Sequence, residues 1–93
     1  MPKWRNLPAG RLVDANMFYV YVISSLRRTY IYVGITNNSN RRIDEHQKGY
    51  NKTTRAYRPF RVILVEKYKT RQEARKREKY LKSGIGKEFL KSK

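Results

Sequence analysis

The sequence contains no cysteine, one histidine and only seven acidic residues among its 93 residues. Without cysteine, neither disulfide bonds nor thiolate zinc sites can form. The lone His46 cannot build a histidine-rich metal cluster by itself. Any metal must therefore be held mainly by oxygen ligands.

Long apolar runs are also missing, and no segment is apolar and long enough to span a bilayer. We find neither a basic amphipathic anchor nor the charged and apolar regions of a signal peptide. These absences disfavour a membrane partner and make a cytoplasmic location the expectation.

Positive charge dominates what is present. The 23 Lys and Arg residues give a formal net charge of +16. Such a field attracts polyanions, and binding should weaken with salt because each neutralised phosphate releases counterions. Nucleic acid is the leading partner, and 93 residues suffice for one compact domain.

Residues 1–16 are mostly polar, contain Pro2, Pro8 and Gly10, and show no periodicity. We interpret them as an N-terminal extension to a domain over residues 17–93. Three alternatives stay open for it: a disordered segment, a tag-like addition before an internal start at Met17, or a cover that packs on the domain.

Three segments have the composition of strands. Phe18–Ile23 and Tyr30–Thr36 are rich in β-branched and aromatic residues and predict a β-hairpin. Val62–Val65 is a continuous apolar run, typical of a strand covered on both faces, and we expect it at the centre of the sheet.

Two helices are predicted between and after these strands. The first follows the N-cap candidates Asn37–Asn40 and ends at Gly49, and the second begins at the capping box Thr70-x-x-Glu73 and ends at Gly84. Residues 49–59 are expected to form an exposed loop, and the tail from Lys87 either one docked turn or a frayed end. The expected fold is α+β, a small three-stranded, mainly antiparallel sheet flanked by helices in the order β-β-α-β-α.

One carboxylate is out of place in the second helix. Ala74, Glu78 and Leu81 share the stripe that should face the core. A carboxylate there must be paired or bound to a metal, because burying it alone is too costly. A structural ion pair and a functional site are equally compatible with this pattern.

Four polar side chains are expected to meet near the first helix. Arg42 and His46 are four residues apart and share a face, close to the hairpin that carries Tyr21 and Tyr32. Each has an ordinary structural explanation alone. Together they match phosphodiester hydrolysis, which needs a positioned water, a proton acceptor and a cation near the phosphoryl oxygens.

At these positions the sequence resembles the GIY-YIG nuclease family, with Tyr19-Val20-Tyr21 and Tyr32-Val33-Gly34 in place of the two tripeptides. The likeness runs from Phe18 to about Lys82. It includes Gly34–Asn37, Arg41-Arg42, Glu45-His46, Gly49, Arg58–Phe60 and Ala74–Glu78. It is greatest to the small stand-alone, single-domain members.

The resemblance implies roles for five residues. Tyr21 and Tyr32 would line the site, and one of them, for which we choose Tyr21, would help to deprotonate the attacking water. Arg42 would stabilise phosphate charge, and His46 would assist positioning or proton transfer. Glu78 would hold a divalent cation, for which Mg²⁺ or Mn²⁺ fits a single carboxylate with waters.

Two departures from the family pattern concern activity: Tyr19 replaces the glycine of the first tripeptide, and no asparagine follows Asn51. Gly34 would let the backbone turn closely.

Surface cations would hold nucleic acid by its phosphates, and exposed Tyr50 or Tyr57 would stack on bases. The cations predicted to bind phosphates are Arg41, Lys48, Lys52, Arg55, Arg58 and Lys76.

The leading hypothesis is a metal-dependent endonuclease acting through one active site on single-stranded, branched or nicked DNA, with DNA favoured over RNA. A non-catalytic basic nucleic-acid-binding module that retains the fold is the alternative, and a basic assembly protein of ribosomal type is a third. A monomer is the default, although cutting both strands of a duplex would need a dimer or two encounters.

Overall fold

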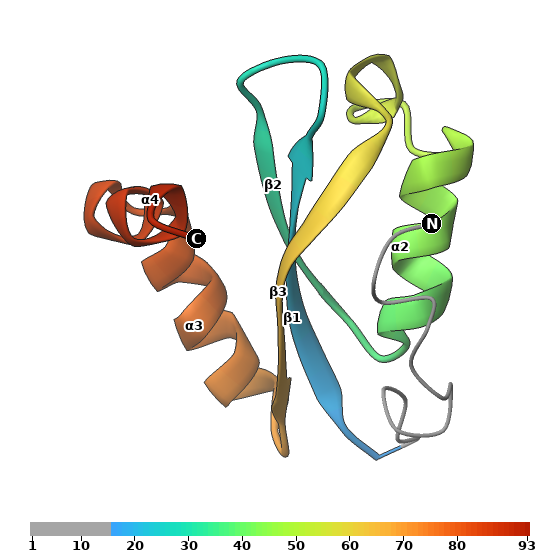
Figure 1. The fold of residues 1–93 in the computed structure, drawn as a ribbon. Coiled ribbons are helices and arrows are strands. Elements are labelled where there is room, and N and C mark those ends of the chain that lie inside the picture. Colours follow the sequence, from blue (N-terminus) through green and yellow to red (C-terminus); the bar gives the residue numbers. More distant parts are fainter. Residues whose placement is uncertain (1–15) are drawn as a thin grey trace.

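A computed structural model describes residues 16–93, so the extension predicted over residues 1–16 lies, apart from Asn16, outside the described part. The described chain has two strands, a helix, a short 3-10 helix, a third strand and two helices (Figure 1). Their bounds are β1 Phe18–Ser25, β2 Ile31–Thr36, α2 Ser39–Lys48, η2 Arg55–Tyr57, β3 Phe60–Tyr68, α3 Arg71–Lys82 and α4 Gly84–Lys91.

The three strands form one antiparallel sheet in the order β2-β1-β3. The expectation that Val62–Val65 forms the central strand is wrong, because β3 lies at an edge and β1 pairs with both neighbours. Five consecutive β1 residues, Tyr19 to Ile23, are buried, whereas β3 is mostly half-buried. The aliphatic run in β3 thus reflects packing against one neighbouring strand and the covering helices.

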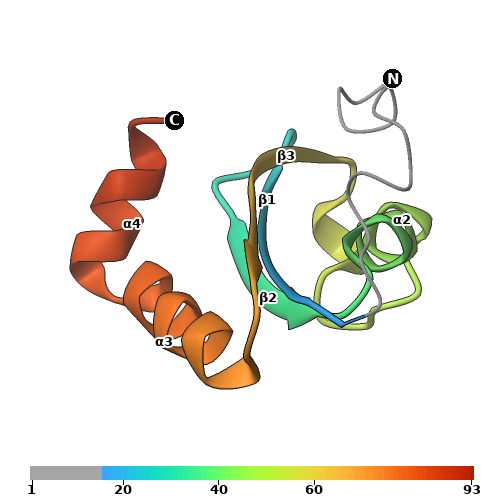
Figure 2. The same ribbon diagram turned by 90° about the horizontal axis from the view of Figure 1, so that it is seen from below.

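Helices cover both faces of this sheet, α2 on one side and α3 with α4 on the other (Figure 2). Alternate residues of β1 serve the two layers. Val20 and Val22 pack with Ala74 and Leu81 of α3, while Tyr21 and Ile23 pack with Ile43 of α2. This arrangement confirms the predicted α+β class, and it means that Tyr21 faces α2.

The helix boundaries follow the predicted caps. The Asn38 side chain accepts a hydrogen bond from the Arg41 amide, and α2 ends at Gly49, whose φ of 82° is left-handed. Thr70 accepts from the Glu73 amide at 3.1 Å to begin α3. Side-chain oxygens therefore satisfy amides that would otherwise lack partners.

The tail differs from the single turn or frayed end that was expected. Ser83 ends α3 and its side chain accepts from the Gly86 amide, so a new helix, α4, begins immediately. Leu90 is 1% exposed and joins the core beside α3. The end of the chain is thus a docked helix. None of the helices in the described residues is long and apolar enough to cross a membrane.

Gly34 lies inside β2, within the strand predicted over Tyr30–Thr36. It lies opposite Tyr21 in the β1–β2 register. A Cβ placed on Gly34 would lie 2.5 Å from the Tyr21 hydroxyl oxygen and 2.6 Å from its ring carbon Cζ. The missing side chain makes room for the Tyr21 ring to lie across β2.

We expect Gly34→Ala to destabilise the protein by about 1–3 kcal/mol, because the added methyl group must displace the buried Tyr21 ring. Urea unfolding measures this difference. Gly84→Ala is the matched control, since a Cβ there meets nothing within 4 Å. Equal unfolding midpoints for Gly34→Ala and wild type would contradict the proposed contact.

Candidate active site

Tyr21, Tyr32 and His46 meet on the face of the sheet that α2 covers. Tyr21 comes from the central strand, Tyr32 from the neighbouring edge strand and His46 from α2. The Tyr21 hydroxyl lies 2.9 Å from His46 Nε2 in a buried hydrogen bond. Ring centroids are 6.1 Å apart for Tyr21 and Tyr32 and 4.8 Å apart for Tyr32 and His46. The predicted convergence of these three side chains is therefore observed.

Arg42 completes this group, one helical turn before His46. It acts electrostatically on Tyr21, Tyr32 and His46. Its Nη1 also donates to Glu45 Oε1 at 3.0 Å. We call Tyr21, Tyr32, Arg42 and His46 the tyrosine–histidine cluster.

Burial sets the protonation states within the cluster. Burial raises the pKa of Tyr21, and so does the neighbouring Tyr32, whereas the charge and hydrogen bonding of Arg42 oppose this shift. Burial, followed by the nearby positive charge of Arg42, lowers the pKa of His46 to about 4. In the free protein near neutral pH, Tyr21 is thus a neutral phenol and His46 a neutral imidazole.

Thr54 is a member of the site that the sequence did not reveal. Its Oγ1 lies 2.7 Å from His46 Nδ1, and both side chains are fully buried. We expected residues 49–59 to form an exposed loop, and Lys52, Arg55 and Arg58 are exposed as predicted. Thr54 instead points inward. No local sequence pattern predicts its contact with His46.

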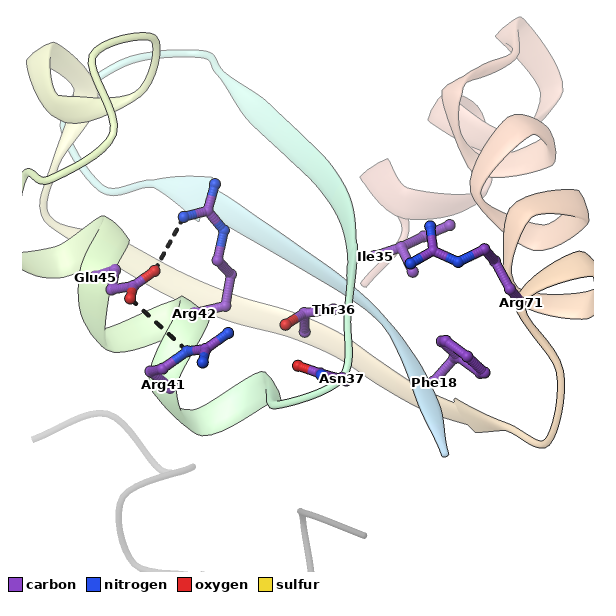
Figure 3. A pocket seen from close by; sticks show the side chains of 8 residues that line it. All are labelled: Phe18, Ile35, Thr36, Asn37, Arg41, Arg42, Glu45 and Arg71. Atoms are coloured by element: carbon purple, nitrogen blue, oxygen red, sulfur yellow. Dashed lines mark hydrogen bonds and ion pairs between the residues drawn. The ribbon is translucent and has the colours of Figure 1, made fainter. Parts of the chain in front are cut away.

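A hollow of about 360 Å³ adjoins the cluster (Figure 3). It runs from α2 past the end of β2 to the start of α3. Its lining consists of Phe18, Ile35, Thr36, Asn37, Arg41, Arg42, Glu45 and Arg71. The lining thus carries three guanidinium groups and one carboxylate, which leaves the hollow positively charged.

The arginines of the hollow are held differently. Glu45 lies 3.0 Å from Arg42 Nη1 and 3.8 Å from Arg41 Nε. Arg71, at the first residue of α3, has its guanidinium carbon 5.5 Å from the centroid of the Phe18 ring. Because arginine presents several donors in a fixed plane, such a hollow suits a phosphate group.

Glu78 stands apart from the tyrosine–histidine cluster. It lies on α3, which covers the opposite face of the sheet, on the stripe of the buried residues Ala74 and Leu81. Its side chain is 16% exposed, and Oε2 is 3.1 Å from Lys82 Nζ. No hydrogen bond or ion pair links Glu78 to the cluster in residues 16–93.

The six predicted surface cations are all exposed but do not form one surface. Lys52, Arg55 and Arg58 lie between α2 and β3, whereas Lys76 lies on α3 across the sheet. Arg41 and Lys48 are on α2, where each forms an ion pair. All of these cations except Lys76 are therefore on the side of the molecule that carries the cluster.

The two tyrosines expected to stack on bases differ. Tyr50 is 71% exposed and free to do so. Tyr57 is half-buried, and its ring already stacks on Tyr30 with centroids 3.9 Å apart and an interplanar angle of 6°. Arg28 lies 5.7 Å from the Tyr57 centroid, so this ring is occupied within the protein.

Metal-ligand chemistry in the described part of the chain is sparse. Within residues 16–93, no group of three or more His, Cys, Asp or Glu side chains could hold a metal ion. Glu78 offers one carboxylate that is partly open to solvent. One carboxylate fits a cation that keeps most of its water, such as Mg²⁺, but not one enclosed by protein ligands.

A sequence profile of the GIY-YIG catalytic domain matches residues 17–89. This match covers most of the chain and includes all five predicted catalytic residues. The chain belongs to the GIY-YIG family, a nuclease family that acts on nucleic acid.

Similar proteins are small members of this family. A UPF0213 protein of Listeria welshimeri is 40% identical over 68 residues, covering 72% of this chain and 74% of its own length. One from Bacillus licheniformis is 37% identical over 71 residues, covering 75% and 72%. The solution NMR structure of a UPF0213 protein from Bacillus halodurans shares 33% identity and a TM-score of 0.51 over 82% of this chain and 83% of that one. These likenesses confirm the predicted family and fold.

The low pKa of His46 predicts acid-sensitive stability. Its ordinary pKa is 6.5, and in the folded protein it is about 4. As the pH falls, the unfolded chain therefore takes up this proton first. The contribution of neutral His46 is complete above about pH 6.5 and is lost as the pH falls to about 4, a change on the order of 3 kcal/mol.

Urea unfolding at several pH values across that interval measures this loss. His46→Gln, which has no titrating ring, serves as the control, because carboxylates titrate equally in both proteins. We expect stability to fall less steeply with acid in the variant. The same pH dependence in both proteins would show that His46 does not titrate as described.

Proposed function

We propose that this chain is a divalent-metal-dependent endonuclease that hydrolyses phosphodiester bonds in DNA through a single active site. The observation that carries the proposal is the convergence of Tyr21, Tyr32, Arg42 and His46 beside a positively charged hollow. Single-stranded, branched or nicked DNA is the proposed substrate. A monomer with one site suffices to cut one strand.

Arg42 and the hollow hold the scissile phosphate. The side chain of Arg42 is 31% exposed, so its guanidinium can reach a bound phosphate while staying anchored by Glu45. Arg41 and Arg71 flank it in the hollow and offer contacts to neighbouring phosphates. Charge that develops on the phosphoryl oxygens during attack is stabilised by donors already in place.

Tyr21 and His46 take up the proton of the attacking water. The water gives its proton to the Tyr21 oxygen while the Tyr21 hydroxyl proton moves to His46 Nε2, 2.9 Å away. This relay ends with a neutral phenol and an imidazolium, so free tyrosinate never has to form. Tyr32 is less buried than Tyr21 and lines the side from which water and DNA arrive.

Glu78 is the residue we assign to the metal. A Mg²⁺ or Mn²⁺ ion bound there would supply Lewis-acid stabilisation of the phosphate. For this, Glu78 must give up its ion pair with Lys82, which is cheap because the Lys82 side chain is 55% exposed.

A non-catalytic nucleic-acid-binding module is the second candidate. The position of Glu78 on the opposite face of the sheet, paired with Lys82, favours it. The basic hollow would then bind phosphates without cutting. A module of this kind would bind DNA as strongly with metal as without it.

A cleavage assay decides between these two functions. We expect wild type to cut single-stranded, branched or nicked DNA when Mg²⁺ or Mn²⁺ is present. Arg42→Ala should lower the single-turnover rate by roughly 10²–10³-fold, because it removes a donor to the developing charge. Glu78→Gln should abolish the dependence on metal and most of the cleavage. RNA of the same sequence tests the preference for DNA.

Binding measured in parallel without metal is the necessary companion. Lys87→Ala on α4 removes one positive charge far from the cluster and controls for net charge. Arg71→Ala should weaken DNA binding more than Lys87→Ala does. It should also reduce the slope of log binding constant against log salt concentration by about one, the value for one lost phosphate contact. Tight binding without cleavage under every condition would establish the second candidate, and full cleavage by Glu78→Gln would refute the metal assignment.

A further inference from the structure

The hydrogen bond between Thr54 and His46 lies behind the tyrosine–histidine cluster, on the side away from Tyr21. His46 uses both ring nitrogens, Nε2 with Tyr21 at 2.9 Å and Nδ1 with Thr54 at 2.7 Å. A neutral imidazole has one N–H donor and one acceptor nitrogen. The partner on one nitrogen therefore decides what the other nitrogen can do.

The groups around Tyr21 favour one direction for the first hydrogen bond. Tyr32 and Arg42 both interact with the Tyr21 oxygen, and the guanidinium of Arg42, which acts by hydrogen bonding and charge, has only donors. The Tyr21 oxygen thus accepts from that side, and its own proton is free to be donated to His46 Nε2. When Tyr21 donates to Nε2, the neutral His46 ring carries its proton on Nδ1 and donates it to Thr54 Oγ1.

We infer that Thr54 is a positioning residue that holds His46 in the Nδ1–H tautomer, with Nε2 open to accept the Tyr21 proton. The geometry supports a dedicated role. Thr54 and His46 are each 0% exposed, so water cannot replace the threonine hydroxyl. Without Thr54, the Nδ1–H group would be buried with no acceptor, and rotation or tautomer exchange would become favourable.

The loop between α2 and β3 is built to present Thr54 inward. Asn51 Oδ1 accepts from the amides of Thr53 and Thr54 at 2.8 and 3.3 Å. The Thr54 carbonyl in turn accepts from the Tyr57 amide at 2.9 Å. These bonds fix the backbone on both sides of Thr54, whereas the neighbouring Thr53 is exposed. The loop thus positions one threonine and leaves the other in solvent.

The chain allows an unambiguous test because His46 is its only histidine. In ¹⁵N-labelled protein near neutral pH, imidazole NMR reports directly which ring nitrogen carries the proton. We expect Nδ1 to be protonated and Nε2 to be unprotonated in wild type and in Thr54→Ser. Thr54→Val, which keeps the shape but removes the hydroxyl, should shift the population toward Nε2–H.

Thr53→Val is the matched control, since it makes the same chemical change one residue earlier on the exposed side. Its spectrum should equal that of wild type. An Nε2–H tautomer in wild type, an unchanged spectrum in Thr54→Val, or the same shift in Thr54→Ser would each overturn the inference. Urea unfolding of each variant establishes that the protein is folded under the conditions of the NMR measurement. Loss of folding is then not mistaken for a change of tautomer.

The catalytic consequence rests on the proposed function and is measured separately. Thr54→Val should slow the single-turnover cleavage rate by at least about tenfold, with DNA binding unchanged and with recovery in Thr54→Ser. If wild type cuts no DNA, the proposed function fails while the NMR result still stands. If wild type cuts and Thr54→Val cuts equally well, the positioning role fails instead.

Discussion

The hydrogen bond between Tyr21 and His46 is the interaction on which the rest of the site depends. It joins the central strand to α2 through two side chains that are almost completely buried. A polar pair in this position is costly unless every donor and acceptor is satisfied. Gly34 leaves space for the Tyr21 ring, Thr54 satisfies the far side of His46, and Arg42 counterbalances the effect of burial on Tyr21.

The sheet separates the two halves of the proposed chemistry. The cluster lies on the α2 face, and Glu78 lies on the α3 face. The hollow is the feature that joins these faces, because its lining continues from Arg42 on α2 around the end of β2 to Arg71 on α3. Since Arg71 and Glu78 are seven residues apart in one helix, they share a stripe. A bound DNA strand that crosses the edge strand β2 would therefore pass along both.

Much of the fold could be predicted from the sequence because its signals are local. The capping residues Asn38 and Thr70 and the left-handed Gly49 set helix ends through contacts within a few residues. The spacing of Arg42 and His46 similarly identified one face of α2. The order of the strands could not be predicted in this way, because an apolar run indicates burial without indicating which strands lie on either side.

The parts that could not be predicted depend on contacts between distant segments. Thr54 looks like any polar loop residue until the fold brings it against His46, eight positions earlier. Gly84 was predicted to end the second helix, and only the docking of Leu90 shows that a further helix, α4, begins there. Glu78 was recognised as unusual on its stripe, but the face of the sheet to which α3 packs is a tertiary property.

The central claim is that Tyr21 and His46 act as one proton-transfer unit, and a double-mutant cycle tests it most directly. Single-turnover cleavage rates would be measured for wild type, Tyr21→Phe, His46→Gln and the double variant, all verified as folded. The account predicts that the double variant loses about as much rate as either single variant, because each change breaks the same relay. Losses that multiply would show that the two side chains act independently and would contradict the account.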